Sequence, residues 1–204
     1  NKLNPDMITN YTKVVFKDRL EVLLGKNKNE SNQNIEEQVQ SSPIEITNEY
    51  IEIVKIANQY YDKVFVDLDY NLNQDIREQI IDQSDLIILN SSQNYKSLKE
   101  LKENKENNKL LKSPRTLLLI GRYDKYSKYN VKNITRYLGE KNKVLTIPYN
   151  TLYFEACNEA GVPDLFLKLK KMYDLDDRNA IFMEEIKRAS ENIIYRLQEL
   201  QTIM

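Results

Sequence analysis

Two carboxylates follow a short apolar run and are the side chains best suited to chemistry. Residues 64–66 are β-branched or aromatic without polar alternation, a pattern typical of a strand buried on both faces of a parallel sheet. Asp67 follows this run directly, and Asp69 lies close behind it. Ligands of open α/β sheets lie just beyond the carboxyl ends of strands, so Asp67 is a candidate holder of a magnesium ion. The alternative is that Asp67 only accepts hydrogen bonds from the following turn.

Polar stretches also follow three other apolar runs. The runs predict buried strands and span residues 86–89, 116–120 and 144–147. The polar stretches after them span residues 90–94, 121–124 and 148–150. Because the carboxyl ends of parallel strands meet at one edge of a sheet, we expect these stretches to gather there with Asp67.

Helices are expected between the strands. Thr47 and Asn73 are candidate N-caps, and Gly139 is a candidate helix stop. Helical apolar spacing covers residues 50–61, 73–83, 131–138, 152–160 and 178–200. Alternating strands and helices predict an α/β fold with a mostly parallel sheet and helices on both faces.

The chain is expected to form one main domain. Its 204 residues are enough for one sizeable core, which we place at residues 1–172. Residues 19–24 predict a further strand near its start, and about residues 26–42 are polar enough to predict a flexible loop. Residues 173–204 are expected to form a C-terminal helix packed on the domain. The polar start at Asn1 leads us to expect a further segment before it.

Composition excludes several classes of chemistry. Histidine is absent and Cys157 is the only cysteine, which excludes histidine-activated nucleophiles, internal disulfides and cysteine zinc sites. One cysteine fits a reducing, cytoplasmic setting. The net charge is −1, which argues against a strongly basic nucleic-acid protein. No apolar run approaches the roughly 18 residues of a membrane span, so no transmembrane segment is expected.

A phosphate-binding loop is missing. The four glycines, at positions 25, 121, 139 and 161, form neither a G-x-x-x-x-G-K-[ST] nor a G-x-G-x-x-G pattern. A triphosphate is held mainly by backbone N–H groups at such loops. We therefore expect that this chain alone does not hydrolyse nucleotides efficiently.

Five segments in the same order resemble the ParA/MinD group of deviant P-loop ATPases, and are closest to its CpaE and TadZ branch. They lie between about residues 19 and 172: "RLEVLLG" at 19–25, "YDKVFVDLDYNL" at 61–72, "SDLIILNSSQN" at 84–94, "LLLIGRYDKYS" at 117–127 and "TIPYNTLYFEACNEAGVP" at 146–163. The resemblance implies a P-loop NTPase-like fold of the SIMIBI type. It also implies ATP and Mg²⁺ as cofactors, and a homodimer that positions DNA or a secretion or pilus complex.

The resemblance also implies site residues. Asp67 would be the catalytic, Walker B-type residue near the metal. The adenine would be flanked by Gly121, Arg122, Pro148, Tyr149 and Asn150. The sequence departs from the family at three positions. Gly121 replaces the usual Asn, Asn150 replaces the usual Asp, and Asp69 stands where a small residue or Pro normally lies. The family's first strand, its P-loop and the following helix have no counterpart here and are expected before Asn1.

Two other functions stay open. One is a non-catalytic scaffold or localisation protein of the same fold, for pilus or secretion assembly. The other is a receiver-like domain phosphorylated at Asp67. A receiver-like domain needs an acidic pair after its first strand and a lysine at the end of a late strand, and this chain shows neither in the right order. The basic residues near the C-terminus alternate with acids, so a solvated helix face is favoured over a DNA site. Tyr123, Tyr126 and Tyr129 are expected to pack, and Cys157 to be a small core residue.

Overall fold

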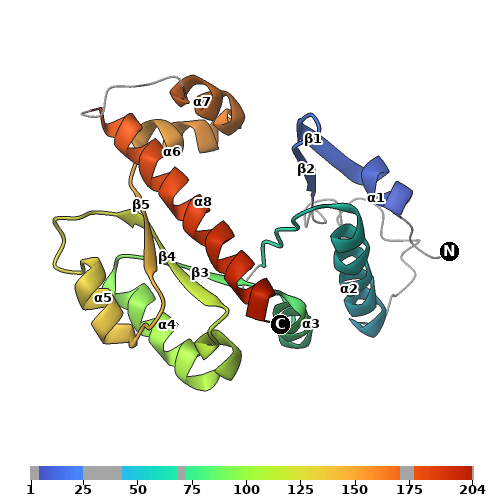
Figure 1. The fold of residues 1–204 in the computed structure, drawn as a ribbon, viewed down its shortest axis with the longest axis horizontal. Coiled ribbons are helices and arrows are strands. Elements are labelled where there is room, and N and C mark those ends of the chain that lie inside the picture. Colours follow the sequence, from blue (N-terminus) through green and yellow to red (C-terminus); the bar gives the residue numbers. More distant parts are fainter. Residues whose placement is uncertain (1–4, 25–42, 69–71, 171–176, 204) are drawn as a thin grey trace, which may run out of the picture. The chain divides into compact units, whose positions relative to one another are not determined.

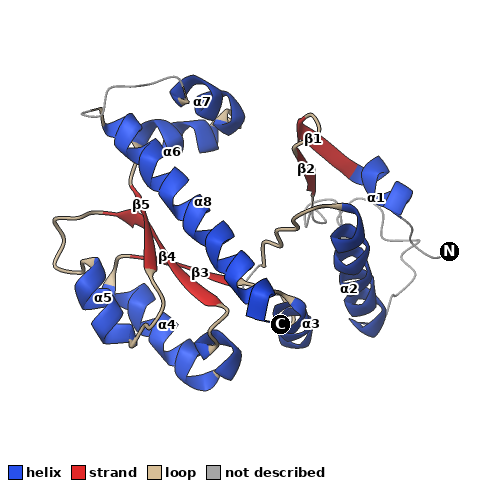
Figure 2. Ribbon diagram, viewed as in Figure 1, coloured by secondary structure: helices blue, strands red, loops and turns tan. Residues whose placement is uncertain are grey.

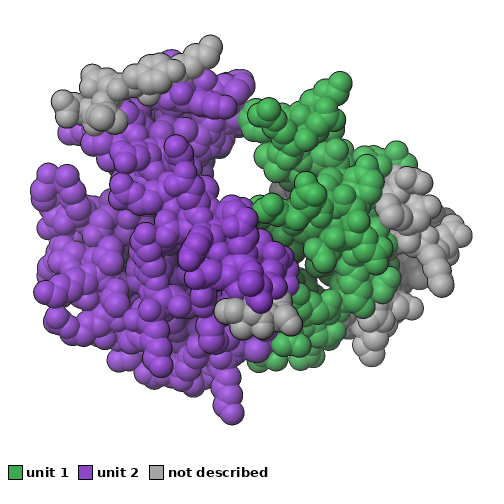
Figure 3. Space-filling model, viewed as in Figure 1, with its two compact units in different colours: residues 1–83 green, residues 84–204 purple. Residues whose placement is uncertain are grey.

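A computed structural model describes residues 5–24, 43–68, 72–170 and 177–203 (Figure 1). The chain divides into two compact units, unit 1 at residues 1–83 and unit 2 at residues 84–204 (Figure 3). The loop predicted at 26–42 lies outside the described residues, as does Asp69.

Unit 1 combines helices with a β-hairpin. Its elements are α1 (Pro5–Tyr11), β1 (Thr12–Phe16), β2 (Leu20–Leu23), α2 (Pro43–Tyr60) and α3 (Gln74–Gln83). The strands are antiparallel, and Asp18 in their turn has a φ of 58°, a left-handed conformation that Asp tolerates better than most residues. Ile8, Ile56 and Ala57 form a small buried cluster.

A carboxylate joins the hairpin to the end of α2. Glu21 Oε2 accepts hydrogen bonds from Tyr61 Oη at 2.5 Å and from Thr12 Oγ1 at 2.8 Å. The Tyr61 bond, followed by the Thr12 bond, lowers the pKa of Glu21. The same bond to Glu21 is the main cause that raises the pKa of Tyr61. Each partner therefore favours the ionised carboxylate and the neutral phenol.

The prediction of a buried strand at residues 64–66 is wrong. Within the described residues this segment pairs with no other strand. Val64 packs against the buried cluster of Ile8, Ile56 and Ala57, whereas Phe65 is 73% exposed and Val66 40% exposed. A run of three apolar residues fixes no ladder partner, so its composition alone did not distinguish a strand from an irregular extended segment.

Two other predictions in unit 1 can be compared directly. α2 begins at Pro43, so Thr47 lies inside the helix, and the prediction that it is the N-cap is wrong. Asn73 does precede α3, and its Oδ1 accepts the backbone N–H of Asp75 at 2.8 Å. The strand expected at 19–24 is confirmed as β2, but it pairs in the hairpin.

Unit 2 contains a three-stranded parallel sheet in the order β3-β4-β5. Its strands are β3 (Ile87–Ser92), β4 (Thr116–Tyr123) and β5 (Val144–Pro148). The connecting elements are α4 (Tyr95–Asn107), the 3-10 helix η2 (Lys109–Lys112) and α5 (Val131–Leu138). After the sheet come α6 (Thr151–Asn158), α7 (Val162–Leu169) and α8 (Arg178–Ile203). α5 ends at Gly139, whose φ of 65° suits glycine, as predicted.

Helices cover both faces of this sheet (Figure 2). On one face of β4, Leu118 and Ile120 pack with Leu98 of α4 and Ile134 of α5. The opposite face carries Leu117, which packs with Ala189 of α8. Successive side chains of a strand point to opposite faces, so the apolar run of β4 serves two helical layers. The α/β prediction with a parallel sheet is confirmed at this coarse level.

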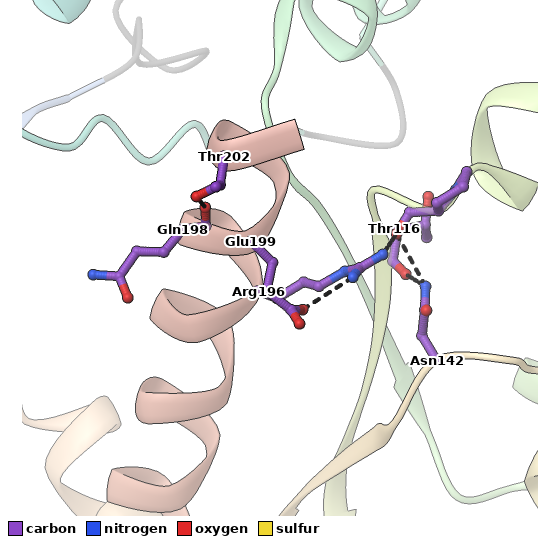
Figure 4. A network of polar contacts seen from close by, with 7 residues as sticks. Thr116, Asn142, Arg196, Gln198, Glu199 and Thr202 are labelled. Carbon is purple, nitrogen blue, oxygen red and sulfur yellow. Dashed lines mark hydrogen bonds and ion pairs between the residues drawn. The ribbon is translucent and has the colours of Figure 1, made fainter. Parts of the chain in front are cut away.

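Polar contacts anchor α8 near the start of β4 (Figure 4). Arg196 donates from Nη2 to the Pro114 carbonyl at 2.7 Å and pairs through Nη1 with Glu199 at 3.0 Å. Asn142 Nδ2 donates to the carbonyls of Thr116, at 2.7 Å, and Pro114, at 3.1 Å. These contacts satisfy carbonyls just before and at the start of β4.

Candidate ligand edge of the parallel sheet

The carboxyl ends of β3, β4 and β5 meet at one edge, as the sequence predicts. Ser92 at the end of β3 is paired with Gly121 of β4, and Tyr123 of β4 with Pro148 of β5. Five of the six predicted site residues, all but Asp67, therefore lie on two adjacent strand ends or the turn after them. This is the edge at which open α/β sheets bind ligands.

Gln93 links the end of β3 to the loop after β4. Its Nε2 donates to the carbonyls of Asp124, at 2.8 Å, and Tyr129, at 2.9 Å. Its Oε1 accepts the backbone N–H of Asp124 at 2.8 Å. One amide thus fixes both ends of the loop between β4 and α5. The sequence places Gln93 among the polar strand-end residues but does not indicate that it links the two ends of this loop.

Arg122 has a strained backbone at this edge. Its φ is 52°, in the left-handed region that residues with a Cβ adopt at a cost of about 1–2 kcal/mol. Gly121 and Arg122 together lie opposite the single residue Ile147, because the register shifts between Ile120 and Tyr123. Such β-bulges are frequent next to binding sites. Arg122 is exposed, and no ion pair or side-chain hydrogen bond within the described residues involves its guanidinium.

Gly121 is not forced by space. A Cβ added there would lie 4.0 Å from the Ser91 carbonyl oxygen, which is ordinary contact. Its φ is also not in the left-handed region. Packing therefore does not explain why glycine stands at this position.

Asn150 has a structural role. The residue is 7% exposed, and its Oδ1 accepts the backbone N–H of Tyr153 at 2.8 Å, which caps α6. Its Nδ2 donates to Asn179 Oδ1 at 2.8 Å, which links this turn to the start of α8. Both ends of the amide are used within the protein. The neighbouring Tyr149 is 55% exposed and presents a ring at the same turn.

Asp67, the predicted magnesium ligand, does not have the strand-end position that the sequence predicts. It is exposed, lies in the irregular segment of unit 1, and follows no strand. Across residues 5–24, 43–68, 72–170 and 177–203, no group of three or more Cys, Asp or Glu side chains could hold a metal ion. Magnesium is usually held by one or two carboxylates together with water and substrate phosphates, so a magnesium ion at Asp67 stays a prediction. We derive no chemistry through a metal at Asp67.

A groove that the sequence analysis did not predict lies between α4 and α5. It has a volume of about 270 Å³, and its lining includes Tyr95 of α4 together with Tyr129 and Tyr137. The sequence predicts that Tyr123, Tyr126 and Tyr129 pack. Tyr123 and Tyr129 do pack against the core cluster of the sheet, but Tyr126 is 85% exposed. The spacing of Asn133 and Tyr137, one helical turn apart on α5, could have indicated part of the groove.

Two smaller predictions concern the helices after the sheet. Cys157 is exposed on α6, so its prediction as a core residue is wrong; Ala156 beside it is the buried residue of that helix. Basic residues of α8 pair with acids of the same helix, for example Arg188 with Glu184 at 3.2 Å. This agrees with the expected solvated helix face.

Comparison with protein-family models, with curated proteins and with solved structures gives no match for this chain. In the described part of the chain, no helix has both the length and the apolar character needed to cross a membrane.

Proposed function

We propose that this chain is the body of a ParA/MinD-like nucleotide-dependent positioning protein, and that by itself it binds ATP without turning it over. The observation that supports this best is the edge formed by the ends of β4 and β5. There, Arg122 has a strained backbone at the end of β4, and its guanidinium pairs with none of the described residues. The exposed ring of Tyr149 follows β5, the neighbouring strand. Backbone strain that packing does not require is a marker of functional sites.

The available side chains suit the base of a nucleotide better than its phosphates. The Tyr149 ring and the planar Arg122 guanidinium can each stack on a flat heterocycle. ATP hydrolysis and a magnesium ion would require phosphate-binding lysines and oxygen ligands from residues outside this chain. In the ParA/MinD-like reading the complete protein dimerises and positions DNA or a secretion or pilus complex.

The second candidate is a non-catalytic scaffold of the same fold. Two observations favour it. The Asn150 amide caps α6 through its oxygen and contacts Asn179 through its nitrogen, so both of its ends have a structural role. Asp67 stands at no strand end, which leaves the Walker B-type role without its usual position.

Calorimetric titration with ATP and ADP, with and without Mg²⁺, separates these candidates. The first predicts binding that weakens about tenfold in Arg122→Ala and Tyr149→Ala, roughly the loss of one stacking contact of 1–3 kcal/mol. Arg19→Ala, on the hairpin of unit 1, and Tyr195→Ala, an exposed tyrosine of α8, are the matched controls and should bind normally. Phosphate release should stay at background in every variant, including Asp67→Ala.

Two results would count against nucleotide binding at this edge. One is the absence of any heat of binding, which would favour the scaffold. The other is binding that Arg122→Ala and Tyr149→Ala leave unchanged.

A further inference from the structure

We propose that the groove between α4 and α5 is a docking site for an acidic segment of a partner protein, which inserts one aromatic side chain. This surface is separate from the residues offered for nucleotide binding. The proposal does not rest on that function.

The shape of the groove suits a single ring. Leu98 and Ile134, which are 2% and 1% exposed, lie at its base, and Tyr95, Tyr129 and Tyr137 line it. The volume of about 270 Å³ falls below the roughly 300–1,000 Å³ of pockets for drug-sized ligands. A buried aromatic anchor in an apolar pocket is the usual centre of a protein interface.

The tyrosines converge on one place. The rings of Tyr95 and Tyr137 have centroids 6.4 Å apart and are tilted by 49°. Partial desolvation, followed by the neighbouring Tyr95 and the carboxylates of Glu103 and Glu106, raises the pKa of Tyr137. Single-stranded nucleic acid needs successive stacking rings along a charged groove. Rings that face one small cavity favour a single inserted side chain instead.

The charge around the groove favours an acidic partner. The segment from 124 to 137 carries one carboxylate, Asp124, and four cations: Lys125, Lys128, Lys132 and Arg136. None of these four forms an ion pair with any residue the structure describes. α4 carries four lysines and three glutamates, but its Lys105 is paired with Glu140, so the helix adds no net charge and leaves the excess of cations in place.

Two lysines lie directly over the rings. Lys128 Nζ is 5.3 Å from the centroid of Tyr129, and Lys102 Nζ is 4.7 Å from that of Tyr137. A cation over a ring keeps an ammonium beside the apolar cavity without an ionic partner. Carboxylates that flank an inserted aromatic residue would reach these ammonium groups. Complementary charge of this kind steers association and sets the register of the bound segment.

The test uses a short capped peptide with one Trp between Asp and Glu residues. The chain contains no tryptophan, so the fluorescence reports on the peptide alone. We expect saturable binding that Tyr95→Ala and Lys128→Glu each weaken about tenfold, which corresponds to about 1.4 kcal/mol. Tyr95 is 55% exposed at the start of α4, so its replacement leaves the fold intact. Lys168→Glu on α7 and Tyr195→Ala on α8 are the matched controls.

Competition with two altered peptides and one oligonucleotide completes the test. Replacing the Trp with Ala, or all acids with their amides, should each weaken binding at least about tenfold. No binding, or binding that ignores the Trp or the groove variants, overturns the proposal. Tighter binding of an oligothymidylate than of the peptide also overturns it, and assigns this basic face to nucleic acid.

Discussion

Replacing Arg122 with glycine should stabilise unit 2. Arg122 has a φ of 52°, and relief of the left-handed strain is worth about 1–2 kcal/mol. Glycine also gives the unfolded chain more freedom, which costs about 0.4–1 kcal/mol. No side-chain partner is lost within the described residues, so the net gain in unfolding free energy should be about 0.5–1 kcal/mol. Arg122→Ala retains the strained backbone and should change stability little.

Native-state hydrogen exchange at Leu118 and Ile120 measures this gain, because these amides lie in the most buried part of the sheet of unit 2. Ala160→Gly is the matched control, since Ala160 has a φ of 54° after α6 and is exposed. Both glycine variants should slow exchange, but only Arg122→Gly should weaken nucleotide binding. If Ala160→Gly stabilises the unit and Arg122→Gly does not, the Arg122 side chain contributes to the fold, and the strain argument for this site is refuted.

Three further predictions address buried and titratable groups. Lys105 and Glu140 form an ion pair with side chains only 11% and 6% exposed. Lys105→Met should therefore lower the free energy of unfolding in denaturant by about 3–5 kcal/mol, and the Lys105→Met/Glu140→Leu double variant should recover most of that loss. Asn150→Ala removes the cap of α6 and should cost about 0.5–2 kcal/mol, measured by thermal unfolding. Tyr61 lowers the pKa of Glu21 below its ordinary 4.5, so this carboxylate stabilises unit 1 above that pH. The stabilisation is lost as the pH falls through the lowered pKa. Glu21→Gln should remove this part of the pH dependence of unfolding, which hydrogen exchange of the β2 amides measures.

The opposite results are informative in each case. A loss below about 1 kcal/mol in Lys105→Met would mean that water screens the pair as at a surface. An unchanged melting temperature in Asn150→Ala would mean that α6 does not depend on its cap. The same pH profile with and without Glu21 would mean that its bonds to Tyr61 and Thr12 do not form in solution.

The parallel sheet could be predicted because its signal is local and strong. β3, β4 and β5 contain continuous apolar runs, and Gly139 marks the end of α5 in the way that glycine usually does. Residues 64–66 share the composition of these strands but are too few to determine a pairing partner. β1 was missed because its pairing with β2 depends on a turn through Asp18 in a left-handed conformation.

The candidate site was predictable only as a set of positions. Parallel strands bring their carboxyl ends together, so Gly121 and Pro148 were placed at one edge from order alone. The left-handed backbone of Arg122 follows from the bulge in β4, and the residue types around Arg122 do not predict a bulge. The use of the Asn150 amide depends on Asn179, which is distant in sequence. The groove needed the packing of α4 against α5, because Tyr95 and Tyr137 come from different helices.

The most direct test is backbone amide chemical-shift mapping of the isotope-labelled chain during titration with ATP, with and without Mg²⁺. The account predicts shifts at Ser92, at 121–123 and at Tyr149, none in the β1–β2 hairpin, and little dependence on Mg²⁺. Shifts confined to other parts of the chain, or no shifts at saturating nucleotide, would contradict the assignment of this sheet edge as a nucleotide site.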